Sequence, residues 1–178
     1  EAEGFKIDAV TIQNEPLNRG NSMSLYMTWQ EQRDFVKSAL GPAFEKAGIK
    51  TKILVYDHNY NYDEDKAENF DQKQYPLKIY EDADAAKYID GAAFHAYGGD
   101  KEELLKIHNG RPDKNLYFTE MSIGLLGEGY SFAKDLMWNM REVCIGTINN
   151  YNKAVIMWNY MLDDKHGPDR PGGCDICL

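Results

Sequence analysis

Short apolar runs alternate along the chain with segments in which apolar residues recur every three or four positions. The runs are rich in β-branched and aromatic residues, as buried strands are. They predict strands over residues 7–14, 52–57, 91–97, 116–120 and 154–160. The intervening periodicity predicts helices over 28–47, 67–72, 77–88, 101–109 and 131–149. Strands that alternate with helices in this way predict an α/β fold with a parallel sheet.

Two of the predicted helices carry specific expectations. In the first, Thr28 is positioned to cap the amino end, the Gly41-Pro42 pair is expected to kink or split the helix, and Gly48 is expected to end it. In the last helix, one side is apolar. Its residues are Phe132, Leu136, Met140, Val143, Cys144 and Thr147.

Polar residues that are common in active sites stand at the carboxyl end of every predicted strand. They are Glu15, Asp57, His95, Glu120, and Trp158 with Asn159. A doubly wound sheet gathers its site at one crevice, whereas a barrel brings all its strand ends around one mouth. The pattern therefore favours a (β/α)8 TIM barrel. Because eight strands need about 250 residues, a chain with five predicted strands corresponds to the carboxyl-terminal part of such a barrel. That part leaves some interior residues uncovered, among which we expect Ala9, Thr11, Ala93, Phe118 and Ile156.

Length, charge and cysteine content narrow the class of protein. With 178 residues, 43% of them hydrophobic, the chain is one domain or part of one. A net charge of −9 disfavours nucleic acid and anionic membrane surfaces as partners, and no apolar run reaches the roughly 20 residues of a membrane span. Cys174 and Cys177 lack a second ligand pair for zinc, so they predict either a local disulfide in an oxidising compartment or two free thiols.

Two glutamates at the mouth of a barrel fit glycoside hydrolysis. One carboxyl protonates the departing oxygen, while the other attacks the anomeric carbon or activates water. Either glutamate alone is more simply explained as a surface residue paired with a lysine or arginine. The combination of Glu15 and Glu120 with Asn14, His95 and Tyr97 favours the functional interpretation.

The same residues resemble a known family. The Asn14-Glu15-Pro16 tripeptide resembles the acid/base motif of the clan A glycosidases, and residues 118–122 resemble their nucleophile strand. The ordered set of motifs at residues 11–16, 91–97, 157–159 and 172–177 is similar to glycoside hydrolase family 30, the glucosylceramidase-like and β-1,6-glucanase enzymes.

This resemblance implies strands four to eight of the family's barrel, within a catalytic domain over residues 1–178, without the first three strands and the β-sandwich side domain. It implies Glu15 as acid/base and Glu120 as nucleophile of a retaining enzyme, with carboxyl oxygens within about 6 Å of each other. Glu15 is then expected to hold its proton near neutral pH. The candidate substrate-binding residues are Asn14, Asp57, His95, Tyr97, Trp158 and Asn159. Two of them have an alternative role: Asp57 is expected to bind a sugar hydroxyl or to support His95, and His95 is expected to orient Glu120 or a sugar hydroxyl.

The resemblance thus implies a retaining β-glycosidase acting on β-glucosidic bonds, and we expect no cofactor or metal. Its expected partners are a β-glucan oligosaccharide or β-glucoside substrate and the remainder of the parent chain, and its expected location is secreted or periplasmic. The alternative is an inactive carbohydrate-binding or scaffold fragment of a TIM-barrel glycosidase. The 178 residues alone are expected to lack activity, because an open five-stranded sheet leaves unpaired edges.

Overall fold

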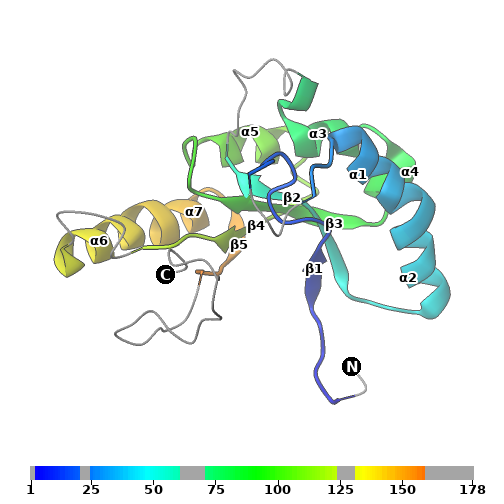
Figure 1. Ribbon diagram of the computed structural model, residues 1–178, viewed down its shortest axis with the longest axis horizontal. Coiled ribbons are helices and arrows are strands. Elements are labelled where there is room, and N and C mark those ends of the chain that lie inside the picture. The colour runs from blue at the N-terminus through cyan, green and yellow to red at the C-terminus, as the bar shows by residue number, and fades with distance from the viewer. Residues whose placement is uncertain (1–2, 21–24, 61–70, 124–130, 159–178) are drawn as a thin grey trace.

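The computed structural model describes residues 3–20, 25–60, 71–123 and 131–158. It contains one curved sheet of five parallel strands, ordered in space as they are along the chain. Figure 1 shows the helices arranged around the outside of this sheet, as in part of a (β/α)8 barrel. The strands are β1 (Ala9–Thr11), β2 (Lys52–Asn59), β3 (Ile89–His95), β4 (Asn115–Glu120) and β5 (Asn152–Val155).

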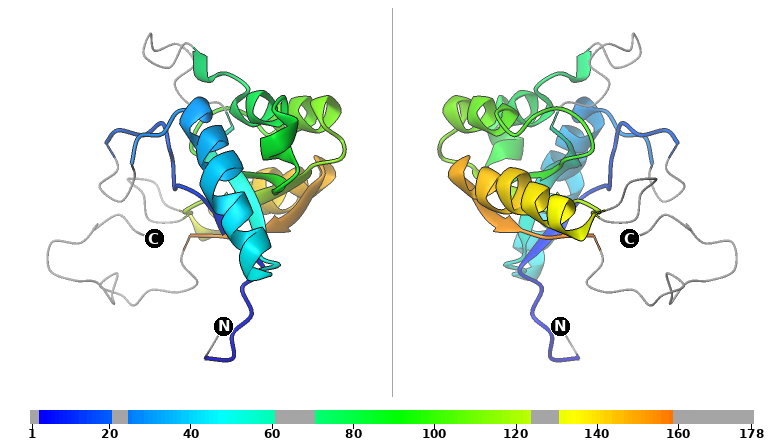
Figure 2. Two further views of the ribbon diagram at one scale, coloured as in Figure 1. Left: turned by 90° about the vertical axis from the view of Figure 1, so that its right-hand side faces the viewer. Right: turned by 90° about the vertical axis from the view of Figure 1, so that its left-hand side faces the viewer.

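Helices connect the successive strands. Between β1 and β2, the α1, η1 and α2 segments form a single rod, which runs from blue to cyan in Figures 1 and 2. None of the helices in the described ranges is long and apolar enough to cross a lipid bilayer. The helical segments are α1 (Trp29–Phe35), the π-helix η1 (Val36–Leu40), α2 (Gly41–Ala47), α3 (Tyr75–Tyr80), α4 (Ala83–Ala86), α5 (Glu103–Gly110), α6 (Phe132–Trp138), the π-helix η3 (Asn139–Ile145) and α7 (Gly146–Asn149).

The first rod begins and ends where the sequence predicts but is not split in between. Thr28 caps α1 in a capping box with Glu31, and Gly48 ends α2 in a left-handed conformation with φ of 66°. The expected break at Gly41-Pro42 is wrong, because Leu40 and Gly41 keep right-handed helical angles. The π-helix widens the turn before Pro42, so that the Gly41 N–H donates to the Val36 carbonyl.

The last predicted strand is displaced towards the amino terminus. β5 begins at Asn152 and ends at Val155, although the chain beyond it still follows β4 through the N–H groups of Ile156 and Trp158, which donate to the Phe118 and Met121 carbonyls. The other predicted strands are confirmed as elements, with β1 shorter than expected. Pro76, expected to separate two helices, lies in the first turn of α3.

The hydrophobic core lies between the sheet and the helices, and it includes two residues that we expected to be uncovered. Ala93 and Phe118 are fully buried, and Phe118 packs near the Tyr60 ring at 6.3 Å between centroids. Ile156 is exposed, as expected, and Ala9 and Thr11 are partly exposed. On the last helical rod, Val143 is buried but Phe132 is 68% exposed.

Candidate active site

Glu15 lies in the loop that follows β1, four residues after Thr11, and the backbone fixes its position. Its φ of 46° is unusual for a residue with a side chain, and its N–H donates to the Asp57 carbonyl at 2.9 Å. The carboxylate is 7% exposed, and its Oε2 accepts a hydrogen bond from Asn18 Nδ2 at 2.7 Å. Glu15 is therefore held by both its main chain and its side chain.

Glu120 is the last residue of β4, and its carboxylate accepts a hydrogen bond from the Tyr97 hydroxyl, two residues beyond the end of β3. The Tyr97 hydroxyl donates to Glu120 Oε1 at 3.2 Å, and the Tyr97 hydroxyl oxygen accepts the Ser122 N–H at 2.9 Å. Burial of the Tyr97 hydroxyl raises its pKa to about 12, so it remains a neutral donor across the physiological range.

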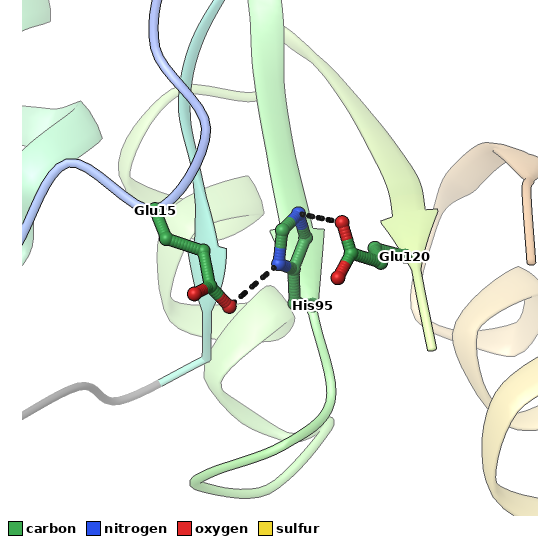
Figure 3. A group of neighbouring side chains, drawn as sticks. All are labelled: Glu15, His95 and Glu120. Carbon is green, nitrogen blue, oxygen red and sulfur yellow. Dashed lines mark hydrogen bonds and ion pairs between the residues drawn. The ribbon is translucent and has the colours of Figure 1, made fainter. Parts of the chain in front are cut away.

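His95, the last residue of β3, lies between the two glutamates, as Figure 3 shows. Its Nδ1 is 3.3 Å from Glu15 Oε1, and its Nε2 is 3.9 Å from Glu120 Oε2. One atom from each of the three side chains can be chosen so that all lie within 4.8 Å of one another. The carboxylate oxygens thus meet the distance expected from the sequence, on strand ends that share one face of the sheet.

Asp57 lies beside this group at an irregularity in β2. Tyr56 and Asp57 both have positive φ, 74° and 60°, and the pairing of β2 with β3 shifts register between Tyr56 and His58. Such a bulge inserts one residue and redirects its side chain. Asp57 Oδ2 accepts the Thr11 hydroxyl at 2.6 Å, and Oδ1 accepts the Thr119 hydroxyl at 2.7 Å and lies 3.1 Å from His95 Nε2.

The charges at this site follow from burial and from these contacts. Burial opposes the charge on His95, but the hydrogen bonds to Asp57 and Glu15 prevail and raise its pKa to about 9. Burial likewise opposes ionisation of Glu15, and the hydrogen bonds from His95 and Asn18 overcome it, lowering its pKa to about 2. The pKa of Glu120 is raised, chiefly by burial.

The directions of these pKa shifts differ from the expectation that Glu15 holds a proton near neutral pH. That expectation considered an apolar setting and the charge of Glu120, and both do act on the site. It did not include a charged imidazole directly hydrogen-bonded to Glu15. The raised pKa of His95 and the lowered pKa of Glu15 together favour the proton on His95.

The remaining predicted site residues differ in their exposure to solvent, and some lie outside the described residues. Asn14 precedes Glu15 and is half-buried. Tyr97 and Trp158 are 41% and 43% exposed, as a residue in contact with a ligand needs to be. Asn159, Cys174 and Cys177 lie outside the described residues.

Several residues in the site are not evident from sequence reasoning. Thr11, Thr119 and Asn18 hold Asp57 and Glu15, and Asn59 Oδ1 accepts the Tyr97 N–H at 2.9 Å. The only signal for them is that polar residues stand within a few positions of each strand-end acid. The atoms of Glu15, His95 and Glu120 are close enough to share a cation, but metal binding needs a neutral imidazole, and the pKa of about 9 for His95 opposes it.

Comparison with known proteins extends over nearly the whole chain. The model of the glycosyl hydrolase family 30 TIM-barrel domain matches residues 1–172. An endo-1,6-beta-D-glucanase of Neurospora crassa is 33% identical over 99% of this chain, which corresponds to 34% of that protein. The lysosomal acid glucosylceramidase of Mus musculus is 30% identical over 93% of the chain and 33% of its own length.

A solved structure, the endo-beta1,6-glucanase BT3312, is similar in both fold and sequence. It superposes with a TM-score of 0.91 at 60% identity, over 99% of this chain and 38% of the other. The chain thus spans about a third of the length of the curated relatives that it matches. The expected partial barrel and the resemblance in motifs are both confirmed, and the chain belongs to glycosyl hydrolase family 30.

Proposed function

We propose that the protein containing this chain is a retaining β-glycosidase that cleaves β-glucosidic linkages, with a β-1,6-linked glucan as its substrate. The observation that carries the proposal is the pair of carboxylates, Glu15 and Glu120, with oxygens within 4.8 Å of each other. Retaining enzymes have carboxyl groups about 5–5.5 Å apart, whereas inverting enzymes need about 6.5–9.5 Å to admit a water. The choice of a β-1,6-glucan over a glucosylceramide follows the relative with 60% identity.

In this mechanism Glu120 attacks the anomeric carbon while Glu15 protonates the departing glycosidic oxygen. The bond to the leaving group breaks as the bond to Glu120 forms, giving a covalent glycosyl-enzyme. Glu15, now ionised, takes a proton from water, and the resulting nucleophile displaces Glu120 from the sugar. Tyr97 donates to the Glu120 carboxylate and so stabilises its charge before attack and after release.

The proton for the first step belongs to the Glu15 and His95 pair. In the free protein the two pKa shifts favour its position on His95 Nδ1, which faces Glu15 Oε1 at 3.3 Å. Its transfer to Oε1 leaves two neutral groups, and a sugar that displaces water from the site favours the neutral pair because charges are costly in a dry environment. Glu15 thereby becomes the acid only when substrate is bound.

The sugar itself is held by residues around this cluster. Asn14 is the proposed donor to the sugar 2-hydroxyl, and the exposed ring of Trp158 is the proposed apolar surface for the pyranose. Asn159 is proposed to contact a further hydroxyl. Because the proposed substrate is a polymeric glucan, we also propose that the protein acts outside the cytoplasm.

Two substitutions in the full-length protein test the assignment. Glu120→Gln is expected to abolish turnover of every substrate, because no nucleophile remains. Glu15→Gln is expected to retain the first step on aryl β-glucosides with good leaving groups, and azide is expected to restore part of the second step. Glu102→Gln, at a side chain 61% exposed, is the matched control and keeps full activity. Equal loss in both site variants on every substrate, without azide rescue, contradicts the assignment.

A further inference from the structure

Asp57 contacts several segments that form the site. Its backbone carbonyl holds the Glu15 N–H, and its carboxylate contacts a hydroxyl on β1, a hydroxyl on β4 and the imidazole at the end of β3. It is placed there by a bulge in which two consecutive residues adopt positive φ. Backbone strain of this kind persists only where the surrounding structure enforces it, and it gathers at functional positions.

We propose that Asp57 is a positioning residue and not a ligand of the sugar: it keeps His95 charged and aligned between Glu15 and Glu120. This inference rests on the proposed function for its kinetic consequences. The arrangement of atoms around the imidazole supports it independently of any activity.

The His95 ring has carboxylate oxygens facing both of its nitrogens. Nδ1 faces Glu15 at 3.3 Å, and Nε2 faces Asp57 at 3.1 Å with Glu120 further away at 3.9 Å. A neutral imidazole carries one N–H, so one nitrogen lone pair would then lie against an ionised oxygen. A doubly protonated ring satisfies both contacts, and Asp57 supplies the closer of the two negative partners.

The side chains around His95 account for its charge without further groups. The acidic neighbours are Glu15, Asp57 and Glu120, from three different segments, and the pKa of His95 is raised accordingly. Two aromatic neighbours complete the surroundings. Tyr97 meets the imidazole edge-on at 6.2 Å, and His58 is 6.4 Å away between centroids, with its Nδ1 accepting the Asn59 N–H.

The environment of Asp57 leaves little access for a substrate hydroxyl. The residue is 6% exposed, and its two oxygens already have three polar partners within the protein. The two threonine hydroxyls come from different strands, Thr11 from the adjacent β1 and Thr119 from β4, which lies two strands away from β2. They fix the carboxylate in the plane where it faces Nε2. This arrangement is that of a charged support for the imidazole.

The test combines a titration of His95 with kinetics of Asp57→Asn in the full-length protein. Asp90→Asn is the matched control, because Asp90 lies near the start of β3, at the opposite end of that strand from His95, and its carboxylate also accepts two hydrogen bonds, from Tyr117 and Asn115. The His95 ring signal is followed by NMR against pH and identified by its loss in His95→Asn.

We expect the wild-type ring to stay charged well above pH 7 and its pKa to fall by at least about one unit in Asp57→Asn, a tenfold loss of proton affinity. Asp90→Asn leaves it unchanged. In kinetics on an aryl β-glucoside, the alkaline limb of kcat/KM moves to lower pH in Asp57→Asn, and kcat falls more than KM rises. Thr119→Val keeps every charge, so it lowers kcat by a few-fold without moving the alkaline limb down.

The possible contradicting results separate the inference about Asp57 from the proposed function. A wild-type His95 that titrates near pH 6.5 overturns the inference, even if no variant folds. A rise in KM with unchanged kcat in Asp57→Asn makes Asp57 a sugar ligand and also overturns it. Absence of glycosidase activity in the wild-type protein contradicts the proposed function, while the NMR titration still decides the role of Asp57.

Discussion

Tyr97 offers a direct measure of how the protein controls the ionisation of Glu120. Its hydroxyl donates to Glu120 Oε1 at 3.2 Å, and burial already raises the pKa of that carboxyl. Tyr97→Phe removes the donor and keeps the ring. Because the hydrogen bond stabilises the ionised form, its loss raises the pKa of Glu120 further, and the acid limb of kcat/KM moves to higher pH.

The size of the shift follows from the geometry of this contact. A hydrogen bond to a charged group contributes about 1.5–3 kcal/mol, and one pKa unit corresponds to about 1.36 kcal/mol. The 3.2 Å distance is long for a charge-assisted O–H···O bond, and the hydroxyl also lies 3.2 Å from Ser122 Oγ. The lower end of this energy range therefore applies, and we expect the pKa of Glu120 to rise by about one unit in Tyr97→Phe. The rate deficit is then largest at acid pH and shrinks as pH rises.

The assay is the pH profile of kcat/KM for an aryl β-glucoside with the full-length protein. Tyr117→Phe is the matched control, because the Tyr117 hydroxyl donates to Asp90 at the other end of the sheet, at 2.7 Å. It leaves the profile in place. An acid limb that is unmoved in Tyr97→Phe, or that moves to lower pH, refutes the account of how Glu120 is held.

Three further predictions concern stability and assembly. A methyl group added at Gly91 would lie 2.0 Å from the Asn115 carbonyl oxygen, so Gly91→Ala is expected to lower the free energy of unfolding by about 3 kcal/mol. Gly48→Ala, where no atom lies within 4 Å of the added methyl group, is expected to lower it less. Urea unfolding compares the two variants, and an equal or smaller effect at Gly91 is evidence against this spacing of β3 and β4. The charged His95 stabilises the folded state, because its pKa is raised to about 9 on folding. This contribution is complete below pH 6.5 and is lost as pH rises through about 9. The wild-type protein is therefore expected to lose more stability over that pH range than His95→Asn does. Residues 1–178 alone are expected to associate and to hydrolyse no aryl β-glucoside, since β1 and β5 each pair on one side only within the described residues. A soluble, cooperative and active monomer in size-exclusion and activity assays contradicts this.

The pattern of strands carries most of what could be predicted about the site. Parallel strands place their carboxyl ends at one edge of the sheet, so a polar residue after each apolar run predicts which side chains meet. This argument brings Glu15, His95 and Glu120 together from positions 80 and 25 residues apart along the chain. It requires no knowledge of the register between strands.

The finer arrangement depends on register and on irregularities that a local pattern does not specify. The bulge at Asp57 turns a residue predicted to contact substrate towards Thr11 and Thr119, and nothing in the run of residues 52–57 signals positive φ at two of them. The ionised state of Glu15 likewise depends on its hydrogen bond with His95, a contact that no local sequence pattern specifies. The displaced β5 has a similar cause, because an apolar run shows that a segment is extended without showing where its ladder to β4 ends.

The configuration of the first product tests the central proposal most directly. The full-length protein is mixed with a β-glucoside or a short β-1,6-glucan, and the anomeric protons of the released sugar are followed by NMR before mutarotation. Two carboxylates within 4.8 Å of each other predict that the β-anomer forms first and the α-anomer appears only later. Initial release of the α-anomer contradicts the assignment of Glu120 as a nucleophile and of Glu15 as its acid/base partner.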